Sequence, residues 1–134
     1  MRVLGVDYGI KRIGLAIGES EVVMAFARNY LSGTGDFAAD ARSVADYAER
    51  EQCDLVLLGV PYLESGDEGE QARLTLKFAD ELTNLGVKLQ LWDERYTTSA
   101  ARSKLSHLDA ESRKKAIDGE AARIMVLEFL ESGS

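Results

Sequence analysis

A short apolar run at the start of the chain constrains the fold more than any other stretch. Residues 2–9 read RVLGVDYG, so a series of branched apolar residues stops at Asp7. Such a run predicts a buried central strand, and in open α/β sheets ligands bind beyond the carboxyl ends of the strands. Asp7 is therefore the first candidate functional residue. The alternative is that Asp7 only opens a turn to Gly9, because Asp and Gly are common turn residues.

The order of the later patterns predicts a mixed sheet with helices on both faces. Short links after the first strand favour an antiparallel meander, and longer segments with helical spacing separate the last two apolar runs. We expect a single α/β domain over residues 1–134, with a three-stranded antiparallel meander, two parallel strands and flanking helices. The expected later strands are 13–18, 22–31, 55–58 and 87–92, and the expected helices are 37–49, 72–83 and 97–130, the last with a polar link at 106–112.

The composition narrows the possible functions. The chain of 134 residues contains one cysteine and one histidine, so it cannot form an internal disulfide. We interpret Cys53 as structural, because it precedes an apolar strand and has no evident histidine partner. His107 lies in a polar stretch, which disfavours Ser-His or Cys-His catalysis. Catalysis is therefore expected to depend on carboxylates. No stretch resembles a membrane span or a signal peptide, so we expect a cytoplasmic protein.

The charge distribution is uneven along the chain. A formal net charge of -7 argues against nucleic-acid binding through bulk charge. Between residues 95 and 123, however, seven Lys or Arg residues face four Asp or Glu residues, a local balance of +3. This segment predicts a basic face on an acidic protein. The alternative is a solvated helix surface with ordinary ion pairs.

Acidic residues occur at the end of the last expected strand and within the last helix. Asp93 and Glu94 follow the strand, and Asp118 lies on an apolar helical stripe with Ala122. If the helix-connected strands run parallel to the first, these acids share one edge of the sheet with Asp7. Clustered carboxylates repel one another unless a cation such as Mg²⁺ neutralises them. Two such ions can activate water against a phosphodiester. Asp118 could alternatively cap a helix.

Several cationic and hydroxyl side chains could then hold a phosphate backbone. The threonines among them could instead cap the helix that follows, and we favour that alternative slightly. The candidates for contact with nucleic acid are Lys11, Arg12, Arg95, Thr97, Thr98, Arg113, Lys114 and Lys115.

A set of short motifs in this order resembles the YqgF-type, Holliday-junction-resolvase-like nucleases of bacteria over essentially the whole chain. Each motif is weak alone, and their order and spacing together are specific. The matching stretches are GVDYG at 5–9, KRIGLA at 11–16, GVP at 59–61 with Gly66, Phe78, DERYTT at 93–98, and Ile117–Asp118 with Ala121–Ala122.

The resemblance implies a ribonuclease H-like fold and a nuclease that uses Mg²⁺ or Mn²⁺. It implies a role in processing the 5′ end of precursor 16S ribosomal RNA. Asp7, Glu94 and Asp118 match the acidic positions of the family, and the resemblance makes them the catalytic and metal-binding residues. Asp93 could take the place of Glu94, because neighbours in a strand point to opposite faces and the sequence does not fix the phase at a strand end.

Three other functions stay open from the sequence. The first is Holliday-junction cleavage in DNA recombination or repair, which would need two sites related by symmetry and hence a homodimer. An RNA nuclease could act as a monomer. The second is a non-catalytic factor that binds ribosomal RNA. The third is an actin-like or sugar-kinase ATPase. Such proteins need two domains of this type to enclose a nucleotide, so the length of 134 residues excludes this function unless the chain dimerises.

Overall fold

The fold is built from five strands that precede or alternate with the helices. The computed structural model describes residues 1–96 and 110–133, and for Tyr96 and residues 110–118 it describes the backbone only. The elements in chain order are β1 (Arg2–Asp7), β2 (Arg12–Glu19), β3 (Met24–Ser32), α1 (Phe37–Arg50), β4 (Leu55–Val60), α2 (Glu70–Asn84), β5 (Leu89–Asp93), the 3-10 helix η1 (Glu94–Tyr96) and α4 (Ala110–Glu131).

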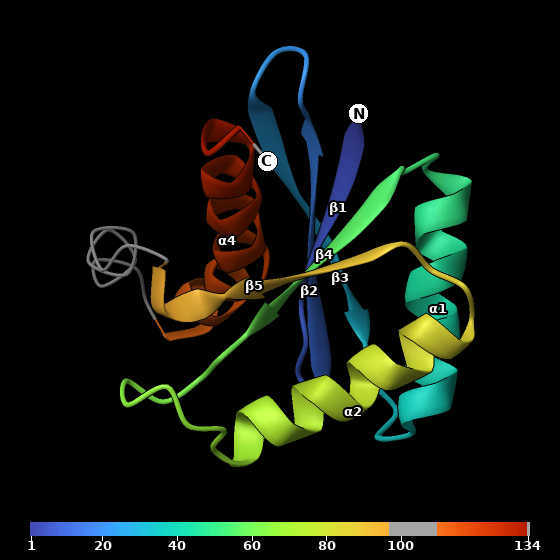
Figure 1. Ribbon diagram of the computed structural model, residues 1–134, viewed down its shortest axis with the longest axis vertical. Helices are drawn as coiled ribbons and strands as arrows, with labels where there is room; N and C mark the ends of the chain where they lie inside the picture. The colour runs from blue at the N-terminus through green and yellow to red at the C-terminus, as the bar shows by residue number, and fades with distance from the viewer. Residues whose placement is uncertain (97–109, 134) are drawn as a thin grey trace.

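The strands form one mixed sheet in the order β3-β2-β1-β4-β5 (Figure 1). β1 pairs antiparallel with β2, and β2 pairs antiparallel with β3, which makes the meander. β4 lies parallel to β1, and β5 lies parallel to β4. This arrangement confirms the predicted fold class. It also brings the carboxyl ends of β1, β4 and β5 to one edge of the sheet.

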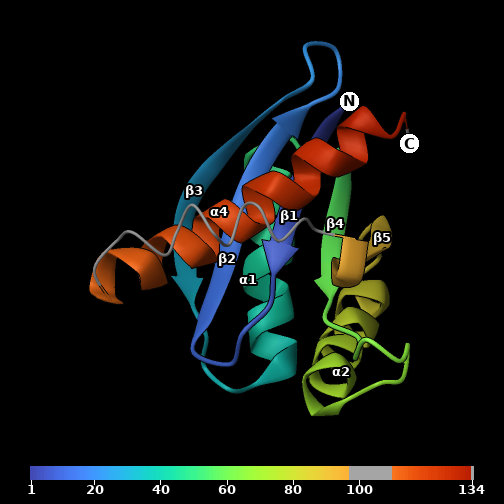
Figure 2. The same ribbon diagram turned by 90° about the vertical axis from the view of Figure 1, so that its left-hand side faces the viewer.

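Helices cover both faces of the sheet and create two cores. Helices α1 and α2 lie on one face, and α4 lies on the other (Figures 1 and 2). Leu4 and Val6 of β1 belong to the core with α1 and α2, whereas Val3 belongs to the core under α4. Because side chains alternate along a strand, Asp7 falls on the α4 face. None of the helices in the described residues is long and apolar enough to cross a membrane.

Helix α4 packs directly onto the sheet because the strands beneath it carry glycine. A Cβ atom at Gly5 would overlap Val126 and lie 3.1 Å from the carbonyl oxygen of Ala122. A Cβ at Gly18, which pairs with Val3, would lie 3.0 Å from Leu130. Ala122 therefore lies further toward the carboxyl end of β1 than Leu130 does. Helix α4 runs against the direction of β1, and its N-terminal half approaches the edge that holds Asp7.

Some element boundaries differ from the predicted ones for local reasons. β5 begins at Leu89 rather than at residue 87, because the Val87 N–H donates to the Leu82 carbonyl at the end of α2, at 3.2 Å. β3 begins at Met24 rather than at residue 22, because the preceding turn includes Val23 with a left-handed φ of 50°. Helix α4 begins at Ala110, so the expected polar link is wrong for residues 110–112. Residues 106–109 of that link lie outside the described residues.

The close packing of α4 on β1 predicts that Gly5→Ala destabilises the fold. The added methyl group must displace Val126, and overpacking of this kind costs about 1–3 kcal/mol. Combining Gly5→Ala with Val126→Ala should cost less than the sum of the two single variants, since the second change removes the overlapping atoms. Urea unfolding of the three variants measures this difference. Additive effects would contradict the packing described for α4.

Candidate active site

The carboxylate of Glu94 lies directly over the backbone of Gly59. Glu94 opens η1 immediately after β5, and Gly59 is the penultimate residue of β4. A Cβ atom at Gly59 would overlap the Oε1 atom of Glu94 and lie 2.8 Å from the Sδ atom of Met125 in α4. Only glycine leaves space for this arrangement. The contact with Met125 also places the Glu94 carboxylate on the α4 face of the sheet.

Asp7 reaches the same face from the neighbouring strand. Val6 pairs with Leu58 in the parallel ladder, so the register places Asp7 beside Gly59. Both Asp7 and Glu94 are partly buried. The two acids therefore flank Gly59 at the carboxyl edge of the sheet, one from β1 and one from the end of β5. Asp7 is the last residue of β1, and the chain bends at residues 10–11 rather than turning at Gly9.

Asp93 belongs to a different set of contacts. The preceding residue, Trp92, packs against the core under α4, with its ring centroid 6.0 Å from that of Phe129. Alternation therefore directs Asp93 away from that face. Its carboxylate forms an ion pair with Arg95, with Nη2 2.5 Å from Oδ2. The hydrogen bond from Arg95 lowers the pKa of Asp93. Of the two adjacent acids, Glu94 is the one that shares a face with Asp7.

Arg95 joins the end of β5 to the loop between β4 and α2. Besides Asp93, its Nη1 atom donates to the carbonyl oxygen of Glu64 at 3.4 Å, and its guanidinium carbon lies 5.9 Å from the centre of the Tyr62 ring. Gly66 approaches the same guanidinium, since a Cβ there would lie 3.3 Å from Nη1. Arg95 thus positions this loop beside Glu94. Its predicted contact with phosphate stays a prediction.

Asp118 lies inside α4, one helical turn before Ala122. It is eight residues after the start of that helix, so the capping alternative for Asp118 is wrong. The direction of α4 carries Asp118 toward the edge of the sheet that holds Asp7. Its side chain is outside the described part of the structure, and among the described residues no three acidic, histidine or cysteine side chains form a metal-binding group.

The predicted cationic residues fall at the same end of the molecule. Lys11 and Arg12 follow Asp7 closely, and the Lys11 carbonyl accepts a hydrogen bond from the Gly33 N–H at 2.8 Å. Arg12 lies over the Tyr30 ring, with its guanidinium carbon 5.0 Å from the ring centre. Arg113, Lys114 and Lys115 belong to the first turns of α4. The predicted Thr97 and Thr98, together with His107, lie outside the described residues.

Cys53 shows no sign of a catalytic role. Burial raises the pKa of its thiol to about 11, so the thiol is protonated at neutral pH and is a poor nucleophile. Cys53 also packs against the core formed with α1 and α2. These observations agree with its interpretation as a structural residue.

The donor set at Asp7 and Glu94 fits a hard divalent cation. Both groups supply carboxylate oxygens, which Mg²⁺ and Mn²⁺ prefer over nitrogen or sulfur. Asp7 and Glu94 flank Gly59 on one face of the sheet, and Gly59 has no side chain that would separate the two carboxylates. A cation there would offset their mutual repulsion.

Two solved structures share this fold. A Thermus thermophilus RuvC in complex with Holliday junction substrate matches with a TM-score of 0.61 at 14% identity, covering 99% of this chain and 95% of the other. The yeast mitochondrial Holliday junction resolvase Ydc2 matches with a TM-score of 0.59 at 15% identity, covering 96% and 77%. These likenesses confirm the ribonuclease H-like fold expected from the sequence.

The chain belongs to the RuvX family, whose model is described as a Holliday junction resolvase and matches residues 1–132. A relative from Thermus thermophilus is 35% identical over 99% of this chain and 99% of its own length, and it is named "Putative pre-16S rRNA nuclease". A relative from Myxococcus xanthus with the same name is 35% identical over 98% of this chain and 89% of its own length. The family suggested by the short motifs is confirmed.

The position of the Glu94 carboxylate over Gly59 predicts that Gly59→Ala weakens metal binding without unfolding the protein. The new methyl group would push the flexible Glu94 side chain away from Asp7, and displacing such support lowers metal affinity roughly 10- to 100-fold. Titration calorimetry with Mn²⁺ measures the affinity, and urea unfolding measures the stability.

Gly69→Ala is the matched control, because a Cβ at Gly69 meets only the Leu63 side chain, at 3.0 Å. It should leave the Mn²⁺ affinity unchanged. Equal Mn²⁺ affinity in Gly59→Ala and the unmodified protein would show that Glu94 takes no part in the metal site.

Proposed function

We propose that this protein is a divalent-metal-dependent phosphodiester hydrolase whose active site is formed by Asp7, Glu94 and Asp118. The observation that carries the proposal is the position of the Glu94 carboxylate over Gly59, beside Asp7. Asp118 is included because α4 runs toward that edge and because it matches the third acidic position of the family. The proposal names Mg²⁺ or Mn²⁺ as the cofactor.

The substrate that we propose is precursor 16S ribosomal RNA, cut at its 5′ end. This choice is supported by the names of the relatives at 35% identity, whose lengths this chain nearly matches. A junction-resolving activity on branched DNA is the second candidate, and the description of the RuvX family as a Holliday junction resolvase supports it. A third possibility, a non-catalytic factor that binds ribosomal RNA, gives a different result in the cutting experiment below.

The acids and the cations have separate tasks in this mechanism. Asp7 and Glu94 would hold the cation, which supplies an activated water and neutralises charge on the phosphoryl group when bound. Lys11 and Arg12 extend from the turn that follows Asp7 and would bind phosphates on either side of the bond. Arg113, Lys114 and Lys115 would add a basic surface on α4. These contacts position the backbone and do not read sequence.

The cellular setting follows from the substrate. A nuclease for ribosomal RNA precursors would act in the cytoplasm with nucleic acid as its partner. One active site per chain is sufficient to cut RNA, so we propose that a monomer is competent. A junction resolvase would need a homodimer to cut both strands. We treat residues 1–134 as one nuclease domain in this proposal.

The proposal predicts metal-dependent cutting that requires the acids. The unmodified protein should cleave labelled precursor 16S RNA with Mg²⁺ or Mn²⁺ and should not cleave it in EDTA. Asp7→Asn, Glu94→Gln and Asp118→Asn should each lower the rate at least about a hundredfold, which corresponds to about 2.7 kcal/mol of lost transition-state stabilisation. Gel analysis of the labelled RNA, with a four-way DNA junction run in parallel, measures the rates and identifies the substrate.

Asp93→Asn is the matched control for Glu94→Gln. Asp93 is the adjacent acid, but its carboxylate binds Arg95 and points away from the α4 face. This variant should retain most of the cutting activity. Equal cutting by Asp7→Asn and the unmodified protein, or no metal-dependent cutting of either substrate, would favour the non-catalytic binding factor.

A further inference from the structure

The edge strand β3 is distorted at the level of Asp7. Ile13 pairs with Leu31 and Leu15 pairs with Arg28, so Asn29 and Tyr30 together lie opposite Gly14 in a β-bulge. Gly14 in turn pairs with Asp7. The bulge therefore lies two strands from Asp7, about 10 Å away at the usual strand spacing. Bulges often occur beside active sites, where they redirect side chains.

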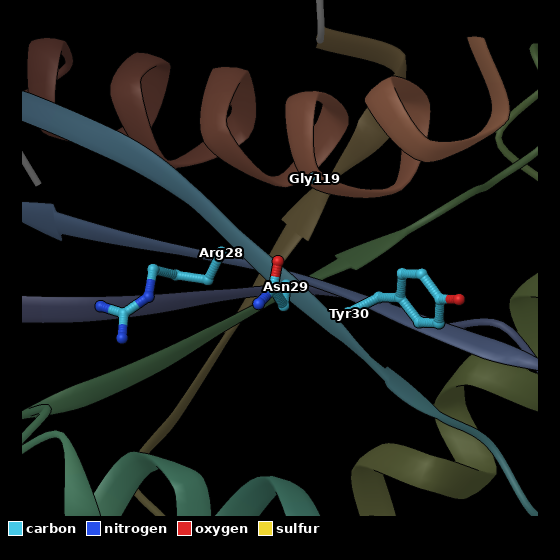
Figure 3. A pocket seen from close by; sticks show the side chains of 4 residues that line it. All are labelled: Arg28, Asn29, Tyr30 and Gly119. Atoms are coloured by element: carbon cyan, nitrogen blue, oxygen red, sulfur yellow. The ribbon is translucent and has the colours of Figure 1, made fainter. Parts of the chain in front are cut away.

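A cavity of about 460 Å³ opens at this bulge. Among the described residues, its lining includes Arg28, Asn29 and Tyr30 of β3 and Gly119 of α4 (Figure 3). Gly119 follows Asp118 directly, and a Cβ at Gly119 would lie 3.1 Å from the Cβ of Ala27. The cavity is therefore formed where α4 meets the edge strand, next to the third proposed acid.

The aromatic ring that lines the cavity, Tyr30, lies beside a cation, Arg12. Tyr30 is 38% exposed, and the Arg12 guanidinium carbon lies 5.0 Å from the centre of its ring. The Arg28 side chain lies on the other face of the sheet, the one covered by α1. Its guanidinium pairs with Glu51 at the end of α1 and lies 5.9 Å from the centre of the Tyr47 ring in α1. In Figure 3, Arg28 and Tyr30 extend in opposite directions along β3. Aromatic rings beside cations bind single-stranded nucleic acids by stacking with the bases.

The start of α4 brings further positive charge to this region. Figure 2 shows the N-terminal end of α4 extending across β3. That end carries Arg113, Lys114 and Lys115 in sequence. Residues 110–118 contain three basic and two acidic residues, a local balance of +1 in a chain whose formal net charge is -7. A phosphate backbone would be attracted to this end of α4 rather than to the surface as a whole.

We propose that the cavity at the β3 bulge is a subsite for a nucleotide that flanks the bond to be cut. The base would stack on Tyr30, and Arg12 would bind the neighbouring phosphate. This inference rests on the proposed function, because it assigns the path of the substrate strand from Asp7. A bulge also interrupts the edge of a sheet and disfavours pairing with a further protein strand at that point. The bulge therefore disfavours a protein partner that would add a strand to the sheet at this point.

Binding of a short fluorescein-labelled single-stranded RNA tests the subsite without cutting, in a chain that carries Asp7→Asn. Adding Tyr30→Leu should raise the Kd about fivefold to a hundredfold, because one stacked base is lost. Tyr30→Phe keeps the ring and should keep the affinity. RNA that contains 4-thiouridine should form a photo-crosslink to the peptide that contains Tyr30, identified by mass spectrometry.

Phe26→Leu is the matched control. Phe26 is an exposed aromatic residue of the same strand, and it pairs with Ile17, which belongs to the core on the opposite face. It should leave the Kd unchanged. Equal Kd values for Tyr30→Leu and its parent, equal losses in Tyr30→Leu and Phe26→Leu, or crosslinks that avoid β3 would overturn the subsite.

The two proposals fail in different ways. If Tyr30→Leu weakens binding but no cutting depends on Asp7, the cavity binds an RNA base and the nuclease proposal fails. If cutting depends on Asp7 but Tyr30→Leu binds RNA as its parent does, the nuclease proposal stands and the subsite fails.

Discussion

The contact between the Glu94 carboxylate and the backbone of Gly59 is the constraint on which the site depends. It requires a glycine near the end of β4, since any larger residue would occupy the place of the carboxylate. The same absence of side chains at Gly5 and Gly18 allows α4 to lie close to the sheet. Glycines on the α4 face of the sheet therefore determine its arrangement. They allow both helix α4 and the Glu94 carboxylate to lie directly against the strand backbone.

The strand register then decides which acids act together. Parallel pairing of β1, β4 and β5 brings three strand ends to one edge, and alternation separates the adjacent acids Asp93 and Glu94. Asp93 stabilises Arg95 and, through it, the loop after β4. Glu94 is left on the face of Asp7. Two neighbouring residues thus have different tasks, one in holding a loop and one in the proposed metal site.

Much of the fold could be predicted from the sequence, because the spacing of apolar residues and the order of the elements can be read directly along the chain. The five strands of the described residues and the mixed sheet follow from apolar runs that end in polar residues, whereas the role of Asp7 stays a prediction. The choice between Asp93 and Glu94 could not be made, because it depends on the phase of β5 and on a glycine from another strand. The bulge at Asn29 and Tyr30 was also not predicted, since nothing in the local pattern marks two residues opposite Gly14.

We propose that Asp7 and Glu94 bind one divalent cation over Gly59. Anomalous diffraction from crystals of the protein soaked in Mn²⁺ tests it most directly, because the anomalous signal locates the ion itself. We expect an Mn²⁺ peak with carboxylate oxygens of both Asp7 and Glu94 as ligands, while Asp93 keeps its ion pair with Arg95. An ordered Mn²⁺ held by Asp93 instead of Glu94, or Mn²⁺ peaks only elsewhere on the protein, would contradict it.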